Sequence, residues 1–110
     1  MKSSELEPHA EKALHFLHRQ AGEHAQARAN ASYMDSWVKL ELQRIKGLMV
    51  GDMSDAAKNA EAMRHPAYEK ALQAQKEADE AWFTAQFKRE AAMALIEAWR
   101  TCCSNERANV

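Results

Sequence analysis

The sequence predicts an all-α protein, built as a long antiparallel helical hairpin with a short intervening helix. The chain of 110 residues contains 22 alanines but only three glycines and two prolines. Alanine favours helices, as do glutamate, lysine and glutamine, whereas glycine and proline interrupt them. Apolar residues also recur at steps of three and four, which is the helical period. Two interruptions, at residues 51–55 and 65–66, divide this pattern into a long, a short and a second long segment.

The first long helix is expected at about residues 9–50. Pro8 suits its first turn, where the missing N–H has no intrahelical partner to lose. The stretch "GDMSD" (51–55) closes it, because Gly51 can take a left-handed conformation and Ser54 can cap the helix that follows. That following helix is short, at about residues 55–64.

The second long helix is expected at about residues 66–103. The pair His65-Pro66 separates it from the short helix, because the residue before a proline disfavours the α conformation. Residues 104–110 then form a flexible tail. All of residues 1–110 belong to one helical domain, since a chain of this length makes a single core.

Alanine marks one face of the second long helix. Steps of four and three place one stripe of small residues on that face, the spacing of a coiled-coil seam. This alanine seam consists of Ala67, Ala71, Ala74, Ala78, Ala81, Ala85 and Ala92, continued by Ile96 and Trp99. Its counterpart on the first helix is predicted at Ala21, Ala25 and Ala31. Small side chains let two helix axes approach closely.

Other apolar residues lie away from this seam, on faces that a two-helix hairpin cannot cover. A helix that is apolar on two faces needs two neighbours. We therefore expect the chain to self-associate as a dimer in a helical bundle, or to bind another protein. The candidate interface residues are Trp37, Glu41, Arg44, Ile45, Met49, Phe83, Phe87 and Leu95.

Glu41 is unusual because it falls inside the apolar arc of the first helix. A carboxylate there must be paired or lie at an interface edge, since burial of a bare charge is costly. Arg44, three residues on, is the candidate partner. The alternatives are a contact with another protein and, least favoured, a catalytic role.

Composition argues against several classes of function. The net charge is −1 with both signs intermixed, so no bulk basic field marks a nucleic-acid-binding protein. No phosphate-binding loop, nucleophile elbow or zinc-ligand spacing is present, so we expect no enzyme, metal or cofactor. Cys102 and Cys103 are expected as reduced thiols, because adjacent cysteines make no disulfide framework. The absence of an apolar signal or membrane-spanning run predicts a cytoplasmic location without membrane contact.

Single-stranded nucleic acid is the alternative partner. Basic residues occur along both long helices, and Trp37, Trp82 and Trp99 could stack on bases. Acidic residues are interleaved with the basic ones, so the two charges largely cancel. The alternative function is therefore a DNA-recombination accessory protein.

The C-terminal stretch "EAAMALIEAWRTCCSNERANV" resembles the ends of small, Ala-rich helical accessory proteins of tailed bacteriophages and prophages. The resemblance covers about the last 45 residues and carries over no functional residue. It implies a non-enzymatic accessory or inhibitor protein that acts by binding a host or phage protein, in the cytoplasm of the host cell.

Overall fold

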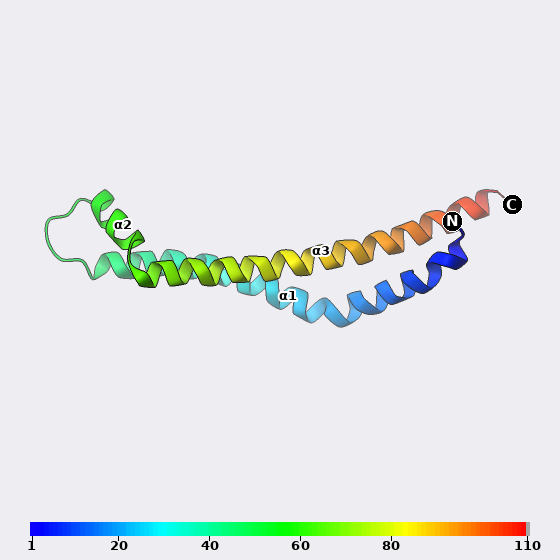
Figure 1. Ribbon diagram of the computed structural model, residues 1–110, viewed down its shortest axis with the longest axis horizontal. Coiled ribbons are helices and arrows are strands. Elements are labelled where there is room, and N and C mark those ends of the chain that lie inside the picture. Colours follow the sequence, from blue (N-terminus) through cyan, green and yellow to red (C-terminus); the bar gives the residue numbers. More distant parts are fainter. Residues whose placement is uncertain (110) are drawn as a thin grey trace. The chain divides into compact units, whose positions relative to one another are not determined.

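The computed structural model describes residues 1–109 and consists of three helices, which confirms the all-α helical hairpin (Figure 1). They are α1 (Ser3–Gly47), α2 (Asp55–Met63) and α3 (Pro66–Ala108). The chain divides into two compact units, each containing a length of α1 and an antiparallel length of α3. Unit 1 comprises Met1–Ala25 with the chain from Phe83 onward, and unit 2 comprises Gln26–Trp82.

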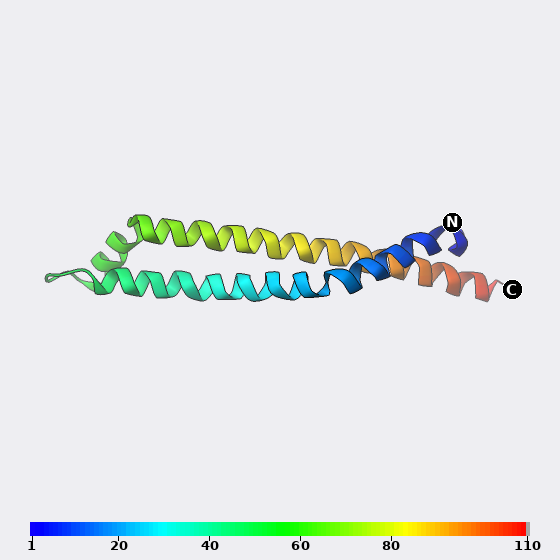
Figure 2. The same ribbon diagram turned by 90° about the horizontal axis from the view of Figure 1, so that it is seen from below.

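In unit 2 the two long helices lie side by side and α2 joins them (Figures 1 and 2). Buried and half-buried residues recur at alternating steps of three and four on both helices and form a seam. This seam includes Ala27, Ala31, Met34, Val38, Glu41 and Ile45 on α1, and Tyr68, Ala71, Gln75, Ala78 and Trp82 on α3. Gln75 also donates a hydrogen bond across this seam to Asp35, at 3.0 Å.

The connection between α1 and α2 uses the turn chemistry of residues 51–55. Gly51 has a φ of 110°, in the left-handed region that favours glycine. The hydroxyl of Ser54 accepts a hydrogen bond from the Ala57 N–H at 3.1 Å and so caps α2, as predicted. Lys46 reaches across the loop to Asp55 at 2.8 Å, and this hydrogen-bonded ion pair lowers the pKa of Asp55.

The connection between α2 and α3 falls at His65-Pro66, as the sequence predicts. Pro66 is the first residue of α3, and the Nδ1 atom of His65 accepts a hydrogen bond from the Ala67 N–H at 3.0 Å. The imidazole therefore takes the capping role that serine or aspartate usually fills.

In unit 1 both long helices extend beyond their predicted ends. α1 begins at Ser3 instead of residue 9, and α3 continues to Ala108, so residues 104–108 are not the predicted flexible tail. Glu106 accounts for the earlier start of α1, because its carboxylate accepts hydrogen bonds from the backbone N–H of Ser3 at 2.7 Å and from its hydroxyl at 2.5 Å. An anion at a helix N-terminus satisfies unpaired N–H groups and the helix dipole. These bonds lower the pKa of Glu106.

The far end of α1 is shorter than predicted, ending at Gly47 instead of about Val50. Leu48 and Met49 donate backbone hydrogen bonds to the carbonyls three residues earlier, which tightens and closes the last turn. Gly51 therefore lies in the following loop and is not the C-cap of α1.

Alanine dominates the core of both units. Among the described residues, seven of the nine buried apolar side chains are alanines, and the other two are Val38 and Ile45. The predicted counterpart seam on the first helix is wrong at Ala21 and Ala25, which are exposed, and correct at Ala31. A methyl group buries little area, so an alanine core leaves the larger apolar side chains outside.

Candidate functional site

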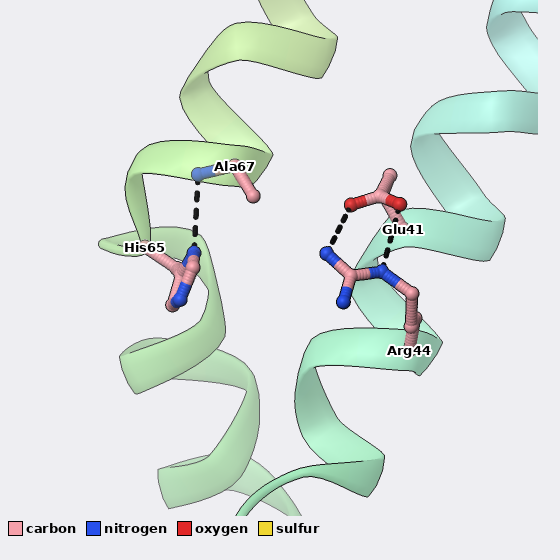
Figure 3. Close-up of polar contacts among 4 residues, drawn as sticks. All are labelled: Glu41, Arg44, His65 and Ala67. Carbon is pink, nitrogen blue, oxygen red and sulfur yellow. Dashed lines mark hydrogen bonds and ion pairs between the residues drawn. The ribbon is translucent and has the colours of Figure 1, made fainter.

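Glu41 and Arg44 form a two-point ion pair on α1 (Figure 3). The Nε and Nη2 atoms of Arg44 donate to the two carboxylate oxygens of Glu41 at 2.9 and 2.8 Å. Glu41 is only 7% exposed, whereas the Arg44 side chain is 53% exposed. The predicted pairing is confirmed, and it places one neutralised charge at the boundary between the seam and the outer face of α1.

This pair lies near the start of α3. The hydrogen bonds from Arg44 hold the pKa of the Glu41 carboxyl below its usual value against the opposing effect of burial, with a smaller electrostatic contribution from His65. The same contact raises the pKa of Arg44. The pair is a local electrostatic contact within α1, at the end of unit 2 that contains α2 and the start of α3. It supplies no proton donor near neutral pH.

Glu41→Gln should lower the melting temperature at pH 7, because the amide cannot pair its charge with Arg44. The folded-state pKa of Glu41 is depressed, so its stabilising effect is present above the ordinary glutamate pKa of about 4.3 and is lost as the pH falls through the lower folded-state value. Melting curves followed by circular dichroism between pH 7 and pH 3 should therefore show a shallower acid dependence in the variant.

Glu61→Gln is the matched control, because Glu61 pairs with Arg64 at 3.4 Å while both side chains are more than half exposed. Exposed pairs contribute little to stability. Equal melting temperatures for the two variants across this pH range would contradict a stabilising role for the Glu41–Arg44 ion pair.

An exposed aromatic stripe runs along the outer face of α1 beside the ion pair. Tyr33 and Trp37 stack, with ring centroids 6.5 Å apart and an interplanar angle of 15°. They are 59% and 39% exposed, and Leu40 and Leu48 continue the stripe at 64% and 66%. Sequence reasoning missed Tyr33 and Leu40, although their spacing with Trp37, at i, i+4 and i+7, marks one helix face.

The five predicted interface residues of the first helix therefore lie in three environments. Trp37 and Arg44 lie outside on the stripe, and Glu41 is buried beside them. Ile45 is wrong as an interface candidate, because it is 2% exposed and packs in the seam of unit 2. Met49 is half-buried beyond the end of α1. The wide apolar arc predicted from the sequence thus contains residues that pack in the core and residues that lie on the outer surface.

In unit 1 the predicted interface residues of α3 are all exposed. Phe83, Phe87 and Leu95 are 54%, 68% and 42% exposed. Phe83 and Phe87 lie at the start of an outer face of α3, here called the phenylalanine face. Exposed alanines continue this face at steps of three and four residues. Its members are Phe83, Phe87, Ala91, Ala94 and Ala98.

The predicted alanine seam holds at four of the five positions at its centre. Ala71 and Ala78 are buried, and Ala74 and Ala85 are half-buried, but Ala81 is exposed. Trp82 takes its place on the inner side of α3. The guanidinium of Arg28 lies over the Trp82 ring, 5.9 Å from its centroid. An indole needs more room than a methyl group, so the helices cannot approach as closely at Trp82 as small side chains such as Ala78 allow.

Other chemistry is sparse in the described part of the chain. Residues 1–109 bring no three histidine, cysteine, aspartate or glutamate side chains together to hold a metal ion. Cys102 and Cys103 are free and half-buried, and the Cys102 thiol contacts the Met1 carbonyl at 3.7 Å. Over the same residues, none of the helices is long and apolar enough to cross a membrane.

Comparison with known proteins finds no protein-family model, curated protein or solved structure that matches this chain. The two exposed faces, and the ion pair between the stripe and the seam, are the features of the chain that indicate a function.

Proposed function

We propose that this chain is a non-enzymatic accessory or inhibitor protein of the bacteriophage type, which acts by binding a host or phage protein in the host cytoplasm. One observation carries the proposal: the phenylalanine face of unit 1 displays two large aromatic side chains to solvent. Aromatic anchors contribute much of the energy of protein–protein interfaces.

The phenylalanine face suits another helix or a groove. Its five members are uncharged, and Glu90 and Glu97 lie along one edge, so an apolar centre lies beside a charged rim, as is typical of interfaces. Ala91, Ala94 and Ala98 allow a close approach, while Phe83 and Phe87 supply anchors at one end. Recognition of one apolar helix face by a groove is a recurrent mode of binding.

The alternative, a DNA-recombination accessory protein that contacts single strands, has less support. Within residues 1–109, five basic side chains pair with carboxylates: Lys39, Arg44, Lys46, Arg64 and Arg100. Two of the three tryptophan rings already have aromatic or cationic neighbours, namely Trp37 and Trp82. Stacking on bases would have to displace these contacts.

Phe87→Glu should abolish binding of the partner, because it replaces one of the two aromatic anchors of the apolar contact with a charge. Parent and variant, each immobilised, are incubated with bacterial lysate at about 0.1 M and about 1 M salt, and the bound proteins are identified by mass spectrometry. We expect the parent to retain a specific protein at both salt concentrations and the variant to lose it.

Ser104→Glu is the matched control, because it adds the same charge to an exposed residue of α3 outside the phenylalanine face. Capture should survive this change. Capture by Phe87→Glu equal to the parent would contradict the proposed face. Binding to a single-stranded oligonucleotide that falls steeply with salt would favour the alternative function.

A further inference from the structure

The aromatic stripe of α1 is a second apolar surface, separate from the phenylalanine face. Its members are Tyr33, Trp37, Leu40 and Arg44 on one side of α1, and Leu48 in the turn that directly follows the helix. Its immediate neighbours are uncharged: Gln26, Ala29, Asn30, Ser36 and Gln43. Arg44 is the single charge on this surface, and Glu41 neutralises it at 2.8 Å.

We infer that this stripe is the surface through which two copies of the chain pair, antiparallel and about a two-fold axis. Tyrosine, tryptophan and arginine are the residue types enriched at interfaces, and charged residues are depleted at interface centres. The inference goes beyond the proposed function, because it assigns a separate surface to self-association and leaves the phenylalanine face for the other protein.

The exposed area is sufficient for a specific dimer. A large aromatic side chain carries about 200 Å² of surface. With the exposed fractions of Tyr33, Trp37, Leu40 and Leu48, the stripe therefore offers roughly 400–500 Å² per copy. Burial on both copies then gives about 800–1,000 Å², which reaches the lower limit of about 1,000 Å² for a specific interface.

The Arg44 guanidinium favours one direction of pairing. A parallel pair would set the Arg44–Glu41 ion pair beside its own copy, with no aromatic ring against either guanidinium. In an antiparallel pair with its axis between residues 38 and 39, Trp37 meets Leu40 and Arg44 meets Tyr33. The guanidinium then lies against an aromatic ring, a favourable contact.

Side-chain size supports the same register. It sets Leu48 opposite Ala29, so the last large residue of the stripe meets a small one. Each contact occurs twice because the surface is self-complementary, as closed two-fold dimers require.

Leu40→Glu tests the surface by placing a charge beside the two-fold axis. Sedimentation velocity over a range of concentrations should show the parent as a dimer and should weaken the variant's dimer at least about 100-fold. Leu72→Glu is the matched control, because Leu72 is 40% exposed on α3 of the same unit and lies off the stripe. It should remain dimeric, and circular dichroism should show equal helicity in all three proteins.

Cysteine cross-linking tests the register without adding charge. In a background with Cys102→Ser and Cys103→Ser, a mixture of Ala29→Cys and Leu48→Cys chains should form a disulfide under mild oxidation. Leu48→Cys alone should form none, because the two copies of residue 48 lie about 28 Å apart along an antiparallel pair.

A monomeric parent, an undisturbed Leu40→Glu dimer, or cross-links between two copies of Leu48→Cys would each overturn the inference. Phe87→Glu separates the two proposals. A dimer whose Phe87→Glu variant still captures the partner would contradict the proposed binding face and leave the self-association surface intact.

Discussion

Ile45→Ala should destabilise the protein by about 2–4 kcal/mol. Ile45 is the most deeply buried large side chain of the described residues, at 2% exposed, and it packs where alanines fill most of the seam. Removing its branched end leaves a cavity that neighbouring methyl groups are too short to fill. Urea unfolding followed by circular dichroism at 222 nm measures the loss.

Leu48→Ala is the control, because Leu48 lies three residues further on and is 66% exposed. At low protein concentration, where dimers dissociate, its effect on the free energy of unfolding should be small. A loss for Ile45→Ala no greater than that for Leu48→Ala would show that Ile45 is not part of the core.

Ala78→Leu should destabilise the protein by about 1–3 kcal/mol, because three further carbon atoms must enter a closely packed seam. Ala78 is 5% exposed in unit 2, between Gln75 and Trp82 on the inner side of α3. Chemical unfolding again gives the free energy, and the parent's helix content should be retained at low temperature.

Ala81→Leu provides the contrast on the next turn. Ala81 is exposed, so leucine there should leave the free energy of unfolding within about 0.5 kcal/mol of the parent. A variant Ala78→Leu as stable as the parent would mean that the helices are spaced too widely for an alanine seam.

The helical pattern could be predicted from the sequence because it is local. The boundaries at residues 51–55 and 65–66 depend on glycine, serine and proline, whose conformational preferences act within a turn. The outer ends could not be predicted in this way. The start of α1 depends on Glu106, 103 residues away along the chain, and local propensity carries no information about that contact.

The assignment of apolar residues to the inside or the outside was predictable only in part. Ile45 and Trp37 lie two turns apart on one wide apolar arc, and their spacing alone does not tell which edge faces α3. For Ala81 and Trp82, which are adjacent in the sequence, the spacing likewise does not tell which side chain faces α1. Contacts such as Arg28 over Trp82 decide the rotation of a helix, and they join residues distant in sequence.

The ion pair was predictable because its members are three residues apart on one helix. The burial of Glu41 was not predictable, because it depends on the start of α3. The aromatic stripe illustrates the converse case. Tyr33 and Leu40 were visible as a helical spacing with Trp37, but only the exposure of all three distinguishes a surface from a core.

Light scattering on the purified chain at micromolar concentrations measures whether the large apolar side chains outside the alanine core make contacts with other chains. We expect a mass of about 25 kDa, which is twice the 12.5 kDa of one chain. A mass of 12.5 kDa for a fully helical, non-aggregating protein would contradict this expectation.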